Sequence, residues 1–173
     1  MKLKKFEISD EPPFDNVRIV HVFFADVQPV FFLVSDEQKR LYVVSLCDER
    51  KEVRWIVSPV IRSDVRRMLL DKITPRELFE ISRKLGSSFV IIKKNNKTEV
   101  KCVSFDEIDK LDLPTENMYF EAEVEELLSY GKSMEYFDKR DKKFTVSEKY
   151  VAWLKDVRTR FCEGKKRDAY SYA

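Results

Sequence analysis

Short apolar runs alternate with polar turns along the first third of the chain. The runs are rich in β-branched and aromatic residues and occupy residues 17–25, 30–34, 41–46 and 53–57. Because they recur about every ten residues, they predict an antiparallel meander of short strands. The run 30–34 is apolar at every position, so we expect that strand to be covered on both faces of the sheet.

Helical spacing replaces this pattern after residue 60. Ser63 is a candidate N-cap for a short helix that reaches about Lys72. The run Thr74-Pro75-Arg76-Glu77 combines a capping threonine, an early proline and a glutamate at the third helical position. These residues predict the start of a second helix, which we expect to end at Gly86.

A hairpin and two longer helices complete the pattern. Residues 88–94 and 98–103 predict two strands joined by an asparagine-rich turn. Apolar residues at helical spacing predict a helix over residues 119–137, with Gly131 as an expected kink or break. A further capping box at Thr145-Val146-Ser147-Glu148 predicts a last helix, which would run to about Phe161.

The pattern as a whole predicts an α+β protein. We expect an antiparallel sheet of about six strands, formed by a meander plus a hairpin, with short helices. A two-helix C-terminal extension would follow it. The expected division is an α+β sheet domain over residues 1–114 and a helical extension over residues 115–173. The extension would pack on that sheet or on a partner.

Glycine and histidine are scarce, and this scarcity excludes several classes of site. The three glycines, Gly86, Gly131 and Gly164, are far apart, so no glycine-rich loop can wrap a phosphate. His21 is the only histidine, which removes most nucleophile–base pairs and most metal sites built on imidazole. We therefore expect a protein that is not an enzyme and that carries no cofactor and no metal.

Composition and charge describe a core-forming chain with a solvated surface. Hydrophobic residues make up 43% and charged residues 37% of the 173 residues, and the net charge is +2. Residues 131–173 hold 12 Lys/Arg and 7 Asp/Glu, so the C-terminal end is basic. An anionic partner at that end and a solvated helical face are both compatible with this asymmetry.

The three cysteines are widely spaced, and no signal peptide or membrane-spanning run is apparent. We therefore expect a cytoplasmic protein with reduced thiols. His21 could act as a base beside Asp26 or Asp36, or pair with Cys47, although a structural strand histidine is the simpler interpretation. Glu121, Glu123, Glu125 and Glu126 could hold a divalent cation, whereas acidic residues also stabilise a first helical turn without any ligand.

Four segments carry a resemblance: Phe31–Asp36, Leu41–Val44, Arg54–Val60 and Leu113–Phe120. Over about residues 28–120 the chain resembles small uncharacterised bacterial proteins that are suspected in phage-defence or toxin-immunity loci. The resemblance implies that the protein is of bacterial or phage origin and is located in the cytoplasm. It transfers no catalytic residue, and residues 121–173 lie outside it.

Two kinds of partner surface follow from the aromatic and basic residues. Aromatic anchors for a protein partner would be Trp55, Tyr136, Phe137, Phe144 and Trp153. An anion or nucleic-acid surface would use Lys139, Arg140, Lys142, Lys143, Arg158, Arg160, Lys165, Lys166 and Arg167.

The expected function is that of a non-enzymatic protein-binding module. Such a module would be immunity-like or a phage-defence accessory protein, and it would act by occluding or scaffolding a partner of unknown identity. The alternative is a nucleic-acid-binding accessory protein that uses the basic and aromatic C-terminal region. A homodimer through the C-terminal helices also stays open.

Overall fold

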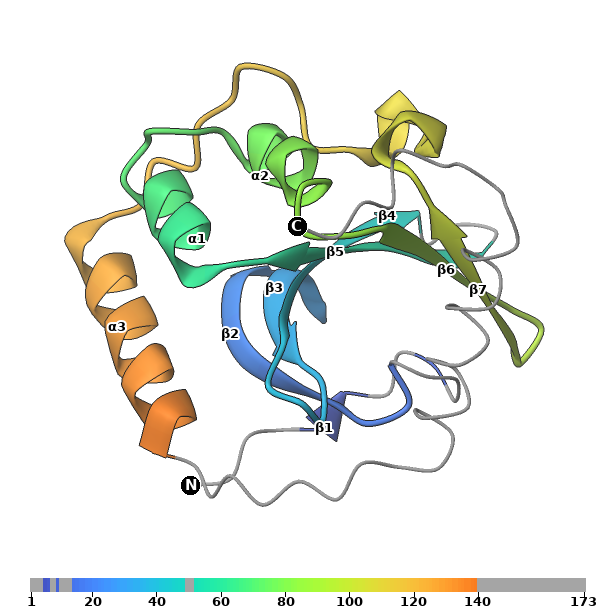
Figure 1. Ribbon diagram of the computed structural model, residues 1–173, viewed down its shortest axis with the longest axis horizontal. Coiled ribbons are helices and arrows are strands. Elements are labelled where there is room, and N and C mark those ends of the chain that lie inside the picture. Colours follow the sequence, from blue (N-terminus) through green and yellow to red (C-terminus); the bar gives the residue numbers. More distant parts are fainter. Residues whose placement is uncertain (1–4, 7–8, 10–13, 49–51, 140–173) are drawn as a thin grey trace.

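Seven antiparallel strands form a single sheet in which spatial order follows chain order, from β1 to β7 (Figure 1). The computed structural model describes residues 5–6, 9, 14–48 and 52–139. The strands are β1 (Lys5–Phe6), β2 (Val17–Ala25), β3 (Pro29–Ser35), β4 (Leu41–Asp48), β5 (Val53–Val60), β6 (Ser88–Lys94) and β7 (Lys97–Val103). The predicted α+β class, meander and hairpin are confirmed. The short strand β1 was not predicted from the sequence.

Local turn chemistry explains why neighbouring strands pair. Asn95 and Asn96 both adopt positive φ, at 52° and 59°, between the paired residues Lys94 and Lys97. Two central residues with positive φ are the geometry that matches the twist of a two-residue hairpin, and asparagine tolerates it. The β3–β4 turn is held by Asp36, whose carboxylate accepts hydrogen bonds from the backbone N–H groups of Gln38 and Arg40.

Strand β3 is buried on both faces of the sheet, as its uninterrupted apolar run predicts. Phe31 and Leu33 belong to the core beneath the helices, whereas Phe32 and Val34 belong to a second core on the opposite face. Phe14 covers that second face, and its ring makes edge-to-face contacts with Tyr42 and Phe89. The sheet is therefore a shared wall between two apolar layers.

Helices α1 (Arg62–Leu69) and α2 (Pro75–Ser82) cover one face of the sheet (Figure 1). The capping box predicted for α2 is present, because Thr74 Oγ1 accepts from Glu77 N–H while the Glu77 carboxylate accepts from Thr74 N–H. The predicted cap at Ser63 is wrong. The N-cap position of α1 is Ile61, two residues before Ser63, and no side chain caps the helix.

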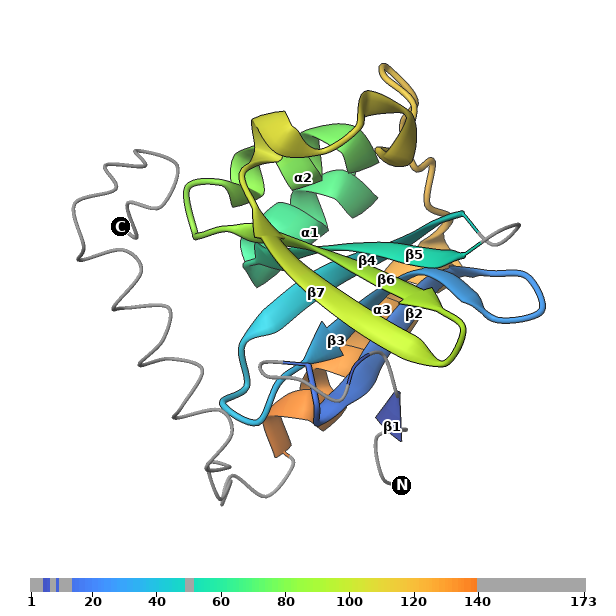
Figure 2. The same cartoon turned by 90° about the vertical axis from the view of Figure 1, so that its right-hand side faces the viewer.

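Helix α3 (Val124–Lys139) follows two short 3₁₀ turns, η1 (Phe105–Glu107) and η2 (Lys110–Asp112). It runs beside β2 (Figures 1 and 2). Tyr130, Met134 and Phe137 place one side of α3 in the core that α1 and α2 also share. The break expected at Gly131 does not occur, since the helix continues through it.

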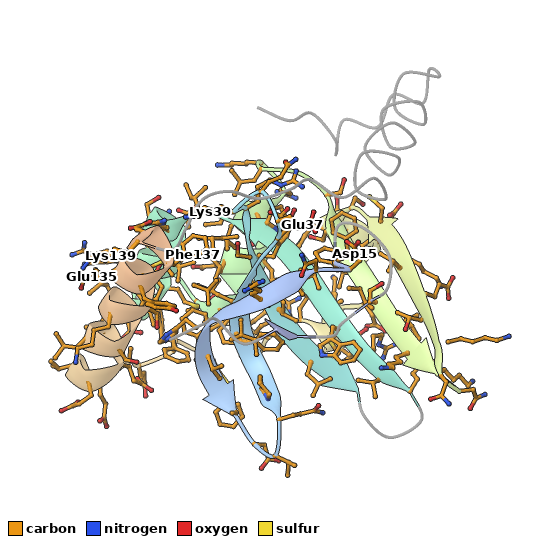
Figure 3. All side chains as sticks on the ribbon, turned by 90° about the horizontal axis from the view of Figure 1, so that it is seen from below. Asp15, Glu37, Lys39, Glu135, Phe137 and Lys139 are labelled. Carbon is orange, nitrogen blue, oxygen red and sulfur yellow. The ribbon has the colours of Figure 1, made fainter. Side chains whose placement is uncertain are left out.

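The C-terminal end of α3 is fixed to the rest of the molecule by cations. Lys39 Nζ donates to the Phe137 carbonyl at 3.1 Å and lies 4.9 Å from the Phe137 ring centroid (Figure 3). Arg62 also lies over that ring and pairs with Asp138. The predicted last helix, over residues 145–161, lies outside the described residues. Within the described part of the chain, no helix is long and apolar enough to cross a membrane.

Candidate binding site

A bulge in β2 turns His21 toward the helices. Ile19 pairs with Val34 and His21 pairs with Leu33, so Val20 is an extra residue between two consecutive partners. In a regular strand, Ile19 and His21 would share a face because side chains alternate. The bulge breaks that alternation, and His21 joins the face of Leu33 beneath the helices.

Helix α3 supplies the surroundings of the imidazole. Ser133 Oγ lies 2.8 Å from His21 Nδ1, and the Tyr130 ring meets the imidazole edge-on at 5.5 Å. Phe23 makes a second edge-on contact at 5.0 Å. His21 is only 8% exposed. Its other ring nitrogen, Nε2, has no hydrogen-bond partner among the described residues.

A pocket of about 270 Å³ opens beside His21, between β2 and the start of α3. Its apolar lining comes from β2, α1 and the segment before α3, and its polar lining comes from His21 and the first turns of α3. The apolar residues are Val22, Phe23, Leu69 and Phe120, and the polar residues are His21, Glu125, Glu126 and Ser129. The buried imidazole and the exposed carboxylates thus face the same space.

The electrostatics of the pocket favour a neutral imidazole between acidic neighbours. Burial lowers the pKa of His21 below its usual 6.5, and the charge of Glu126 opposes this shift without cancelling it. The Glu126 carboxylate also accepts from the Glu123 N–H at 2.8 Å, at the N-terminus of α3. At neutral pH the pocket therefore presents an uncharged acceptor together with two negative charges.

The geometry suits binding better than nucleophilic catalysis. The distance from Ser133 Oγ to His21 Nδ1 is one that a nucleophile and its base could have. However, Ser133 does not line the pocket, so a molecule held there meets the imidazole and not the hydroxyl group. The pocket offers an aromatic and aliphatic wall with hydrogen-bond acceptors, which is a recognition arrangement.

Comparison with known proteins identifies no relative. No protein-family model matches the chain, and neither the curated proteins nor the solved structures that were searched include a match.

Exposed apolar side chains are chain neighbours of residues that line the pocket, and we call this group the α3 surface. It consists of side chains that are 43–66% exposed: Leu70, Met118, Tyr119, Val124 and Leu128. The Glu121 N–H donates to Asp71 Oδ1 at 2.9 Å, which joins the segment before α3 to the end of α1 (Figure 1). Val124 and Leu128 are one helical turn apart and so point to the same side.

The aromatic residues predicted as partner anchors have different positions. Trp55 is 4% exposed in the second core, and Phe137 is 2% exposed in the helix-side core. In this structure both side chains pack inside the molecule and present no surface to a partner. Tyr136 is half-buried on α3. Phe144 and Trp153 lie outside the described residues.

The basic surface predicted for nucleic acid falls almost entirely outside the described residues. Only Lys139 is described, and its ammonium group pairs with Glu135 on the outer side of α3 (Figure 3). The other members, Arg140, Lys142, Lys143, Arg158, Arg160, Lys165, Lys166 and Arg167, lie beyond residue 139.

The thiol pair considered for His21 is not formed. His21 on β2 is level with Leu33 on β3 and Val43 on β4, and Cys47 lies four residues beyond Val43. Standard strand spacings put Cys47 about 16 Å from His21. Its thiol donates to the carbonyl oxygens of Ser45 and Asp112. Asp36, considered as an acid partner of His21, instead accepts from Arg40 Nε and Tyr42 OH.

The acidic cluster is divided equally between the segment before α3 and the first turn of that helix. Glu121 and Glu123 precede the helix, while Glu125 and Glu126 occupy its first turn. Among the described residues, no group of three or more His, Cys, Asp or Glu side chains is arranged to hold a metal ion.

Sequence reasoning missed the helix residues that complete the site. Ser133 is 112 positions away from His21, and no local pattern connects them. Ser129 and Phe120 carry no motif of their own. One feature of the sequence could have indicated these residues. Ser129 and Ser133 place polar side chains beside the apolar stripe of an otherwise amphipathic helix.

Proposed function

We propose that this protein is a non-enzymatic protein-binding module that holds its partner through the α3 surface. The observation that carries the proposal is the exposure of five large apolar side chains at the end of α1, in the segment before α3 and on α3 itself. Isolated exposed apolar residues are common, but a group joined by a helix turn and a hydrogen bond is typical of an interaction site.

The charges around the α3 surface indicate the chemistry of the partner. Glu121, Glu123, Glu125 and Glu126 are exposed beside the apolar residues. A partner segment that carries Lys or Arg around an apolar centre would match this surface in both charge and hydrophobicity. A second copy of the chain fits less well, since a symmetric contact through this surface would bring carboxylates against carboxylates.

The resemblance to proteins of phage-defence or toxin-immunity loci gives a finer version of this proposal. In that version the partner is a basic protein that the module occludes or scaffolds. The acidic, apolar character of the α3 surface supports it, because occlusion requires a surface complementary to the partner's own charged site.

The test is affinity capture from an extract of the native host with tagged wild-type protein and two variants. Val124→Ser combined with Leu128→Ser removes the centre of the α3 surface without touching the core. Leu111→Ser is the matched control, because Leu111 is 91% exposed and lies on η2, outside the α3 surface. Each capture is repeated after nuclease treatment.

We expect one stoichiometric protein that the wild type and Leu111→Ser retain and that the double variant loses, with no effect of nuclease. Equal capture by the double variant would overturn the α3 surface as the binding site. Capture that disappears with nuclease would favour the nucleic-acid alternative.

A further inference from the structure

The pocket between β2 and α3 combines several groups that can bind a ligand. It joins a buried imidazole, two carboxylates and two aromatic rings in a space of about 270 Å³. The α3 surface lies close to the pocket lining, because Glu125 and Glu126, which line the pocket, stand between Val124 and Leu128 in the first turns of α3. A partner on the α3 surface would therefore lie close to the pocket.

We infer that the pocket takes a lysine or arginine side chain of the bound partner. Its apolar wall of Phe23, Leu69 and Phe120 suits the aliphatic stem of such a side chain. Glu125 and Glu126 supply charges of opposite sign to the cationic head. The inference rests on the proposed function for the source of that side chain.

His21 is the observation independent of the acidic residues. It is more than nine-tenths buried and lines the pocket, and its Nε2 has no hydrogen-bond partner among the described residues. When Nδ1–H donates to Ser133 Oγ, Nε2 keeps a lone pair that can accept from an ammonium or guanidinium group. A cationic side chain that enters the pocket would bring a donor to this acceptor, and hydrogen bonds from a charged donor are stronger than those between neutral groups.

The aromatic lining adds to the preference for a cation. Phe23 and Phe120 lie 5.8 Å apart with an edge-to-face arrangement, and both rings border the pocket. The faces of aromatic rings attract cations. The N-terminus of α3 carries about half a positive charge, which the two carboxylates outweigh.

An anionic ligand fits the pocket poorly. A phosphate or carboxylate would face Glu125 and Glu126 together with an uncharged imidazole. Among the residues that the structure describes, no Lys or Arg side chain lines the pocket to compensate that repulsion. A neutral apolar group would fill the wall but would leave Nε2 of His21 without a donor.

The test uses blocked amino acids and the only histidine as a reporter. The cationic probes are N-acetyl-lysine methylamide and N-acetyl-arginine methylamide, and their neutral counterparts carry norleucine and citrulline. Each probe is titrated into the full chain while the ring signals of His21 are followed by NMR. Because the chain has a single histidine, these signals need no assignment by mutation.

We expect saturable shifts with a cationic probe and none with its neutral counterpart. Glu125→Gln should weaken that binding about two- to five-fold, as expected for a partly exposed ion pair. Glu135→Gln is the control, since it removes the same charge from α3 outside the pocket. It should leave the affinity unchanged.

Equal shifts with the neutral counterparts, or no saturable shift with either cationic probe, would overturn the inference. An equal loss of affinity in Glu125→Gln and Glu135→Gln would also overturn it, because the effect would then be general charge and not the pocket. The titration needs no partner protein. It can therefore fail while the capture experiment succeeds, or succeed while the capture experiment fails.

Discussion

His21 makes the stability of the fold depend on pH near neutrality. Burial lowers its pKa in the folded chain below 6.5, so the unfolded chain binds this proton more readily. The stability contributed by the neutral ring is complete above pH 6.5 and is lost as pH falls through the folded pKa. We expect the unfolding free energy to decrease over this window.

Urea unfolding at a series of values between about pH 5 and 8 measures this dependence. His21→Gln should lower the free energy of unfolding at neutral pH, because the contact with Ser133 changes. It should also flatten the pH dependence. An unchanged slope in the variant would show that other groups cause it.

Tyr130 carries a buried hydroxyl group that has no hydrogen-bond partner among the described residues. Burial raises its pKa to about 12, and the charges of Arg62 and Arg66 partly oppose that shift. Removing an unpaired buried hydroxyl should cost nothing, so Tyr130→Phe should leave the unfolding free energy unchanged or raise it by up to about 1 kcal/mol. Thermal unfolding measures this. A loss above about 1 kcal/mol would indicate a partner for the hydroxyl.

At the scale of elements, Gly131 is a weak point in α3. The residue lies inside the helix, and a Cβ atom added to it would meet no other atom within 4 Å. Alanine restricts the unfolded chain more than glycine does and favours the helix. Gly131→Ala should therefore raise the unfolding free energy by about 0.5–1 kcal/mol. Denaturant unfolding of the two proteins checks this, and a decrease would contradict the open surroundings.

The strands were predictable because their signals are local. Alternation, apolar runs and turn residues such as Asn95 and Asn96 lie within a few residues of the structure they specify. The helix starts were less predictable. Thr74 caps α2 as expected, whereas Ser63 does not cap α1 and α3 begins at Val124 and not at 119. Packing against the sheet decides such boundaries, and a capping residue alone cannot.

The candidate site was not predictable, because two events far apart in the chain create it. The bulge at Val20 turns His21 over, and α3 then brings Ser133 and Glu126 to it. A bulge has no reliable signature in a single apolar run, since Ile19, Val20 and Val22 all suit a regular strand. The sequence could name His21 as the only imidazole but not its neighbours.

At the scale of the whole molecule, α3 belongs to the same core as the sheet. Phe137 is 2% exposed within that core. Phe137→Ala should lower the unfolding free energy by about 3–5 kcal/mol, in a single transition detected equally by tryptophan fluorescence and far-ultraviolet circular dichroism. Tyr136→Ala is the milder neighbouring control, because Tyr136 is only half-buried. Two separate transitions would mean that α3 unfolds independently.

The order of strands in the sheet determines which parts of the fold can form while the chain is being synthesised. Each strand from β2 to β5 can pair with its predecessor as soon as it emerges, since spatial order follows chain order. Helix α3 is the exception, because Ser133 is made 112 residues after His21. At about 5–20 residues per second, that interval lasts about 6 to 22 seconds. During it, His21 and Phe23 lack the cover that α3 supplies, so the nascent protein is most prone to aggregation just before its last described helix is made.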